Sequence, residues 1–135
     1  KLVVKVIKVT GAIIQEGNKF LICRRGPSEK AAGLWEFPGG KLEINESLED
    51  CILRELKEEL DIDAELHSLY DNYSFKAKDV IYDLYFFRIK GFSGILSKTV
   101  HDEIKWVKLK DFHNFSFLPG DAPLIKKLEK DSRVL

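Results

Sequence analysis

The segment Leu48–Leu60 limits what this chain can fold into more than any other stretch. It contains no Gly, Pro or Thr and is dominated by Leu, Glu, Lys and Arg, a composition that predicts an α-helix. Ser47 followed by Asp50 resembles a capping box at its start. A surface helix normally keeps charged side chains off its apolar stripe, because positions three and four apart share a face. Here acidic positions fall into or beside the apolar arc: the arc is Leu48, Cys51, Ile52 and Leu56, and the acids are Glu55, Glu58 and Glu59.

The acidic side chains of this helix need a counter-charge. Residues 46–61 hold seven acidic residues against Arg54 and Lys57, a local net charge of −5 (2 − 7). Partly buried carboxylates repel one another, so they require protons, cationic partners or metal. Oxygen ligands on one rigid element suit Mg²⁺ or Mn²⁺. The alternative is a solvated helix whose charges pair at i,i+4 spacing.

The residues before the helix favour the metal interpretation. Pro38-Gly39-Gly40 predicts a sharp bend with little side-chain bulk, where the backbone can approach a metal or phosphate closely. Arg54 can orient a carboxylate by a bidentate pair with Glu46, or it is an exposed surface charge. The bend and the acidic face together predict a site.

The rest of the chain predicts an α/β fold. Apolar and β-branched runs predict strands over residues 3–14, 19–23, 64–75, 80–89 and 104–109, the first two joined as a hairpin through Gly17-Asn18. A second helix is expected over residues 122–130. Strands and helices in this order favour a mixed sheet with helices packed on it, and 135 residues suit a single domain, 1–135.

Composition and missing motifs exclude several classes of function. With 22 basic and 22 acidic residues the chain lacks the basic surface of a nucleic-acid-polymer binder. No apolar run is long enough to span a bilayer and no signal peptide is recognisable, so we expect a cytoplasmic protein without membrane partners. Cys23 and Cys51 are expected to be reduced thiols, and the isolated histidines do not form a zinc motif. A P-loop and a nucleophile elbow are also absent.

Read as a string, the acidic segment resembles the signature of a known family. The residues Gly40, Glu46, Arg54, Glu55, Leu56, Glu58, Glu59 and Ile62 match the Nudix box, G-x5-E-x7-R-E-U-x-E-E-x-G-U with U apolar. The one departure is Asp61 in place of Gly, a less favourable residue for a left-handed helix end. Residues 33–41 and 117–123 are similar to the MutT branch of that family.

The resemblance implies a fold, a reaction and a set of site residues. The fold would be an α/β/α sandwich with a mixed β-sheet between helices. The reaction would be hydrolysis, with Mg²⁺ or Mn²⁺, of a nucleoside diphosphate linked to another group; in MutT-like enzymes a nucleoside triphosphate gives a nucleoside monophosphate and pyrophosphate. By position, Glu55, Glu58, Glu59 and the Gly40 carbonyl would hold the metal and Glu46 with Arg54 would brace the loop; the general base would be Glu55, Glu59 or Glu103. The partner would be a small nucleotide, bound by a monomer or homodimer.

The same resemblance places residues around the base and the phosphates. Phe37 and Asp121 would lie near the nucleobase, and the other substrate-binding candidates are Arg24, Arg25, Trp35 and Lys41. Ionised Asp121 only accepts hydrogen bonds, which suits the amino group of cytosine or the N–H edge of guanine; the Asn of MutT also donates, so Asp departs from the pattern for oxidised guanine. Alternatively, Asp121 is the N-cap of the last helix. Trp35 and Phe37 are either core aromatics, or one of the two stacks on the base instead.

Two other functions remain open at this point. The box encodes only metal and diphosphate chemistry, so a hydrolase of ADP-ribose, another nucleotide sugar or a dinucleoside polyphosphate is the enzymatic alternative. The non-enzymatic alternative is an inactive Nudix ligand sensor. Such domains lose box glutamates, whereas those at 46, 55, 58 and 59 are all present, which favours an enzyme.

Overall fold

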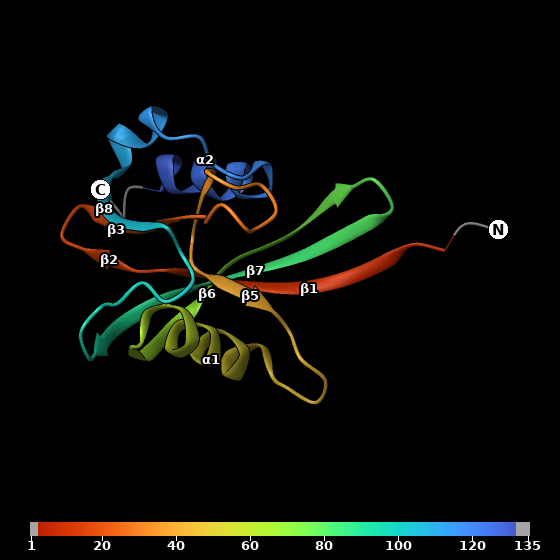
Figure 1. Ribbon diagram of the computed structural model, residues 1–135, viewed down its shortest axis with the longest axis horizontal. Coiled ribbons are helices and arrows are strands. Elements are labelled where there is room, and N and C mark those ends of the chain that lie inside the picture. Colours follow the sequence, from red (N-terminus) through yellow and green to blue (C-terminus); the bar gives the residue numbers. More distant parts are fainter. Residues whose placement is uncertain (1–2, 132–135) are drawn as a thin grey trace.

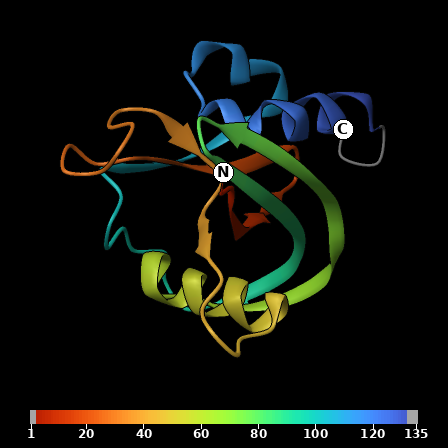
Figure 2. The same ribbon diagram turned by 90° about the vertical axis from the view of Figure 1, so that its right-hand side faces the viewer.

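Two helices lie on opposite sides of the strands in the computed structural model, which describes residues 3–131 (Figures 1 and 2). Helices α1 (Leu48–Leu60) and α2 (Ala122–Lys130) span the ranges that the sequence predicts. Both are too short and too polar to cross a bilayer. Residues 1–2 and 132–135 of the expected domain 1–135 lie outside the described part. The layered α/β arrangement is therefore confirmed.

The strands form two sheets, where the sequence had predicted one. The first is mixed, in the order β5-β1-β7-β6, with β1 parallel to β7 and the other pairs antiparallel. In the second, antiparallel sheet β3 pairs with β2, β4 and β8. The bounds are β1 Lys5–Ile13, β2 Gln15–Glu16, β3 Lys19–Arg24, β4 Trp35–Glu36, β5 Gly39–Lys41, β6 Asp63–Ala77, β7 Val80–Ser93 and β8 Glu103–Lys108. Two 3₁₀ helices not expected from the sequence, η1 (Leu109–Asn114) and η2 (Pro119–Asp121), precede α2.

The predicted first hairpin exists only at its tip. Strand β1 pairs with β5 and β7 in the mixed sheet, and only the two-residue β2 pairs with β3 around Gly17-Asn18. The chain changes sheets beside Ile13 and Ile14, which are both 2% exposed. Consecutive strand residues face opposite sides, and these two side chains enter different hydrophobic clusters. A long apolar run thus serves two sheets rather than one hairpin.

Helix α1 packs its apolar side chains on one of these clusters. Ile52, Leu56 and Leu60 are fully buried there, with Phe87 from β7 at 3% exposure. The helix begins as predicted, with the Asp50 amide donating to the Ser47 hydroxyl at 3.0 Å. It ends at Asp61 in the left-handed conformation (φ 57°, ψ 40°) that the family's Gly usually adopts. The substitution therefore preserves the helix end.

The Pro38-Gly39-Gly40 bend carries the chain from the antiparallel sheet to the mixed one (Figure 1). A Cβ on Gly39 would lie 2.0 Å from the Thr10 carbonyl oxygen. A Cβ on Gly40 would lie 2.4 Å from the carboxyl carbon of Glu55. A side chain at Gly39 would collide with backbone, and one at Gly40 would displace the Glu55 carboxylate, so the bend brings bare backbone against the acidic helix.

Candidate active site

Arg54 fastens the loop before α1 to the helix. Its Nε and Nη2 donate to the two carboxylate oxygens of Glu46, at 2.6 and 2.9 Å, and Nη2 also donates to the Lys41 carbonyl at 3.1 Å. The Arg54 side chain is 22% exposed, so the simple surface-charge alternative is wrong and the bidentate pair is confirmed. This guanidinium lowers the pKa of Glu46 to about 2. Glu46 is therefore ionised at neutral pH.

The third guanidinium nitrogen of Arg54 contacts two further box glutamates, so a single positive charge is shared among three carboxylates. Nη1 lies 2.9 Å from Glu55 Oε1 and 3.1 Å from Glu58 Oε1. The Glu55 side chain is 14% exposed, but that of Glu58 is 57% exposed. The expectation of three inward carboxylates thus holds for Glu55 and Glu59 only, because the helical turn places Glu58 at the solvent edge beside Arg54.

Glu59 is buried and has no cationic partner as close as Arg54 is to Glu46. The residue is 8% exposed, and Oε1 has no hydrogen-bond partner among the described residues. Burial, the carboxyl group of Glu55 and the charge of Glu36 all raise the pKa of Glu59. A solvated acidic helix would leave this side chain in water, so that alternative is wrong.

The backbone beside these carboxylates is held rigidly. The Gly40 carbonyl oxygen faces the Thr10 hydroxyl at 3.3 Å and the Cys51 sulfur at 3.7 Å, and both side chains are buried. Cys51 and Cys23 are free thiols, as expected, and burial raises the pKa of each. The Gly40 carbonyl is thus fixed next to the Glu55 carboxylate that packs on its Cα.

This donor set fits a divalent cation. Between residues 3 and 131 no three His, Cys, Asp or Glu side chains form a ready-made ligand cage. The carboxylates and a carbonyl are nevertheless hard oxygen donors, and one of them, Glu59 Oε1, has no hydrogen-bond partner in that range. Mg²⁺ commonly takes one or two protein carboxylates and completes its shell with water and phosphate oxygens. The residues present suit such an ion.

A second polar cluster, absent from the sequence prediction, adjoins Glu59. Arg25 Nη1 donates to both oxygens of Glu36 at 3.0 and 3.2 Å, and Arg25 Nε donates to the Lys30 carbonyl. His101 Nε2 lies 2.9 Å from Glu36 Oε2 and 3.9 Å from Glu59 Oε1. Sequence reasoning missed Glu36 and His101. Glu36 stood between the two aromatic residues of a noted motif, whereas His101 had no pattern to mark it.

Phe37 and Asp121 meet in the core behind this cluster. The Phe37 amide donates to Asp121 Oδ2 at 3.2 Å, and the two residues are 4% and 8% exposed. Burial raises the pKa of Asp121 to about 8, against the opposing effect of the Phe37 hydrogen bond. At neutral pH the carboxyl group is therefore largely protonated.

Asp121 occupies the N-cap position of α2, as the alternative expected. Its side chain makes no capping hydrogen bond. The hydroxyl of Tyr73, on β6, instead accepts from the Leu124 amide at 3.3 Å and donates to the Gly120 carbonyl at 2.6 Å. Because Tyr73 supplies the cap, the Asp121 carboxyl is available to face Phe37.

Trp35 and Phe37 are core aromatics, the alternative that the sequence left open. The Phe37 ring stacks on Phe117 with centroids 6.1 Å apart, and Trp35 packs edge-on against Phe115 at 5.1 Å. Trp35 is 7% exposed. These packed rings form one wall of the region around Asp121.

The remaining predicted site residues lie at strand ends around this region. Arg24 forms ion pairs with Asp102 at 2.6 Å and Glu103 at 3.4 Å, and its guanidinium lies 5.7 Å from the Trp35 ring centroid. The Glu103 side chain is 35% exposed. Lys41 is exposed at the end of β5. Strand pairing thus places Arg24 opposite both Trp35 and Glu103.

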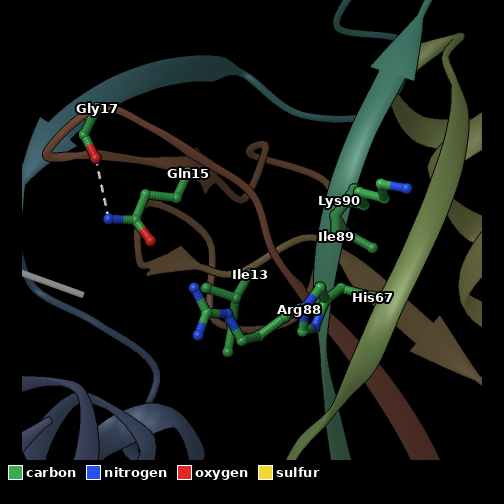
Figure 3. A pocket seen from close by; sticks show the side chains of 7 residues that line it. All are labelled: Ile13, Gln15, Gly17, His67, Arg88, Ile89 and Lys90. Atoms are coloured by element: carbon green, nitrogen blue, oxygen red, sulfur yellow. Dashed lines mark hydrogen bonds between the residues drawn. The ribbon is translucent and has the colours of Figure 1, made fainter. Parts of the chain in front are cut away.

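A separate recess on the molecule involves none of the predicted site residues. It encloses about 250 Å³, and His67 and Arg88 lie side by side within it (Figure 3). Gln15 is already hydrogen-bonded to the Gly17 carbonyl at 2.9 Å, and His67 contacts the Ser68 hydroxyl at 2.8 Å. The residues that line the recess are Ile13, Gln15, Gly17, His67, Arg88, Ile89 and Lys90.

Comparison with known proteins agrees with this fold and site. The NUDIX domain model matches residues 5–128, so the chain belongs to the Nudix family. Within it, the chain is 33% identical to a CTP pyrophosphohydrolase of Escherichia coli K12 over 90% of each protein. It is 31% identical to the 8-oxo-dGTP diphosphatase of the same organism, over 89% of this chain and 93% of that protein. The MutT protein of Methanosarcina mazei Go1 superposes with a TM-score of 0.85 at 25% identity, over 96% and 97% of the chains.

These comparisons confirm the predicted branch. The chain is a MutT-like Nudix hydrolase, and the expected Nudix fold is confirmed as well. Members of this family typically depend on a divalent metal, which agrees with the oxygen-rich donor set beside Gly40.

Proposed function

We propose that this chain hydrolyses a nucleoside triphosphate to a nucleoside monophosphate and pyrophosphate, using Mg²⁺ or Mn²⁺. The observation that carries the proposal is Glu59, a buried carboxylate with one unpartnered oxygen, beside a second carboxylate and a fixed carbonyl. Packing alone disfavours that arrangement, because like charges repel and burial penalises them. Binding a cation removes both penalties.

The box residues divide into ligands and supports. Glu55, Glu59 and the Gly40 carbonyl would hold the cation, with Glu58 contributing from the solvent edge. When bound, a divalent ion supplies charge for the phosphate chain, polarises the phosphoryl group and lowers the pKa of an attacking water. Arg54 holds Glu46, Glu55 and the loop in fixed positions by the contacts described above.

The proton of the attacking water would pass to Glu55, Glu59 or Glu103. Glu103 differs from the other two because it lies on β8 and pairs with Arg24 and Lys105. Substituting Glu103 by Gln therefore tests it without disturbing the carboxylates of α1. Arg24, Arg25 and the exposed Lys41 would meet the phosphates, although Arg24 is paired with Asp102 and Arg25 with Glu36 before substrate binds.

On the base side, Asp121 would bind through a protonated carboxyl. Oδ2 accepts from the Phe37 amide, and Oδ1 has no hydrogen-bond partner among residues 3–131. A protonated carboxyl both donates and accepts, as the side-chain amide of Asn does, so the restriction to N–H edges no longer applies. Cytosine and oxidised guanine, the bases named for the two E. coli relatives, are both candidates, with Phe37 or Trp35 offering a ring edge.

The test is a nucleotide panel with Mg²⁺. CTP, dCTP, GTP, dGTP, 8-oxo-dGTP, ATP and ADP-ribose are each supplied, and the nucleoside monophosphate, pyrophosphate and phosphate are quantified separately, because cleavage of ADP-ribose gives AMP and ribose 5-phosphate without free phosphate. We expect pyrophosphate with at least one cytosine or guanine triphosphate, and loss of turnover with excess EDTA. Cleavage of ADP-ribose without triphosphate cleavage would identify a nucleotide-sugar hydrolase, and no turnover of any compound would identify a sensor. A cytoplasmic location and a monomeric or homodimeric state stay predictions.

A further inference from the structure

We infer that His101 is a positioning residue that keeps Glu59 oriented for a divalent cation. The inference deepens the function proposed above and rests on it. The Nudix box does not include this histidine, which lies about forty residues beyond the acidic helix in the loop before β8. Its role follows from where its ring stands.

The His101 ring lies between two carboxylates. Nε2 is 2.9 Å from Glu36 Oε2 and 3.9 Å from Glu59 Oε1, and the His101 side chain is only 4% exposed. Glu36 also accepts from the Arg25 guanidinium, so it acts as an acceptor and Nε2 of His101 is the donor. The shorter contact directs the N–H to Glu36, whereas Glu59 Oε1 lies next to the ring without a hydrogen-bond partner among the described residues.

The backbone on either side of His101 is fixed to both neighbouring elements. The Thr99 amide and hydroxyl both donate to the Glu59 carbonyl, at 3.1 and 3.0 Å. The Ser97 amide donates to the Leu60 carbonyl at 3.0 Å. On the other side, the Asp102 amide donates to the Arg24 carbonyl at 2.9 Å. The loop therefore ties the end of α1 to β3 and holds the imidazole at one position.

This arrangement separates two acids that would otherwise face one another. The charge of Glu36 is felt at Glu59, and both side chains are largely buried, at 14% and 11% exposure. Without the ring, nothing would stand between the two carboxyl groups, and Glu59 would turn away from Glu36. Groups that orient a metal ligand commonly change metal affinity 10- to 100-fold when removed.

The test measures Mn²⁺ binding to the nucleotide-free protein by the loss of the free Mn²⁺ EPR signal. His101→Leu keeps most of the volume and removes the donor, whereas His101→Gln keeps an N–H near the position of Nε2. We expect a roughly tenfold weaker Mn²⁺ affinity for the Leu variant and a near-normal one for the Gln variant. The control is His67→Gln, an exposed histidine on β6.

The outcomes separate this inference from the proposed function. If the wild-type protein binds no Mn²⁺, the metal-dependent function itself is wrong. If the wild type binds Mn²⁺ and His101→Leu binds it equally well, or if the Leu and Gln variants are weakened alike, the positioning role is wrong. Thermal unfolding of every variant verifies folding, and His101→Asn, whose shorter amide does not reach Glu36, replaces the Leu variant if that one does not fold.

Discussion

Glu59 and Asp121 are the two buried carboxylic acids of the described chain, at 8% exposure each. The cost of burying a carboxylate is compensated differently at the two positions. Glu59 lies on α1 among Glu55, Glu36 and His101, and its Oε1 has no hydrogen-bond partner among the described residues. Asp121 lies among aromatic rings and accepts one backbone hydrogen bond. Burial raises the pKa of both groups.

The difference lies in what can neutralise each acid. The surroundings of Glu59 are acidic and oxygen-rich, so a divalent cation is the matching counter-charge. At Asp121 burial is the largest cause of the raised pKa, and the charges of Glu36 and Arg25 act in opposite directions, so a proton is the simplest counter-charge. A buried acid therefore indicates a binding site only when the residues around it are considered as well. Those residues determine whether a cation or a proton neutralises it.

The largest expected effect comes from removing the charge of Glu59. Glu59→Gln keeps the shape but weakens the cation ligand, so turnover of the best triphosphate should fall roughly 100-fold or more. Glu58→Gln should lower turnover as well. The measurement is steady-state kinetics at saturating Mg²⁺, with the exposed Glu49→Gln on the same helix as the control. Normal turnover by Glu59→Gln would remove Glu59 from the ligand set.

A smaller change is expected on the base side. Asp121→Ala removes the carboxyl that would read the base edge, so the ratio of kcat/KM for CTP to that for 8-oxo-dGTP should change about tenfold, more than the maximal rate does. Competition between the two nucleotides measures the ratio directly. An unchanged ratio would leave Asp121 a structural residue that only receives the Phe37 amide.

The proton on Asp121 predicts a pH-dependent stability. The folded-state pKa of Asp121 is about 8, above the ordinary value of 3.8. The bound proton therefore contributes its full stabilisation of the fold below about pH 4, and this stabilisation is lost as the pH rises through 8. Asp121→Asn keeps the neutral form. The unfolding free energy of the variant relative to wild type should therefore rise between pH 5 and 8, by at most about 1.4 kcal/mol per pH unit.

Urea unfolding at several pH values measures this difference. The exposed Asp79→Asn serves as the matched control for replacing an aspartate by asparagine. A flat profile for Asp121→Asn would mean that Asp121 is already ionised in the folded protein.

The smallest expected effect concerns the cap of α2. Tyr73→Phe removes the hydroxyl that bonds Gly120 and Leu124, and should lower the unfolding free energy by about 1 kcal/mol. Tyr82→Phe is the control, since the Tyr82 hydroxyl makes no hydrogen bond to the described residues. Equal stabilities of the two variants would show that the hydroxyl of Tyr73 does not hold this helix start.

The sequence predicted most of the fold because its local signals are strong. Helix α1 has a Ser cap and uninterrupted helix formers, and both of its ends were predicted correctly. The long strands were found by their β-branched and apolar content, but the division into two sheets was not, because the run through Ile13 and Ile14 gives no sign of which side each residue faces. The short β4 and β5 are fixed by the Gly39 and Gly40 contacts, which act between distant residues.

The site was predicted where chemistry and spacing coincide, and missed where they do not. The Arg54–Glu46 pair followed from helix geometry and the box. Glu58 was placed too far inward, because a helical arc read from sequence does not show where the sheet ends. His101 reaches Glu59 only through the loop that follows β7, and Tyr73 reaches Leu124 only through the packing of α2 on β6. Such contacts depend on tertiary structure and leave no local pattern.

The segment from Phe37 to Gly40 has a consequence for substrate length. The amide of Phe37 bonds Asp121 at one end, and Gly40 packs against Glu55 at the other, three residues later. Three peptide steps span at most roughly 11 Å. If the base is bound at Asp121 and the phosphate bond is cleaved at Glu55, this short segment fixes the distance between the two places. The site would then select nucleotides in which the base and the cleaved bond lie that same distance apart.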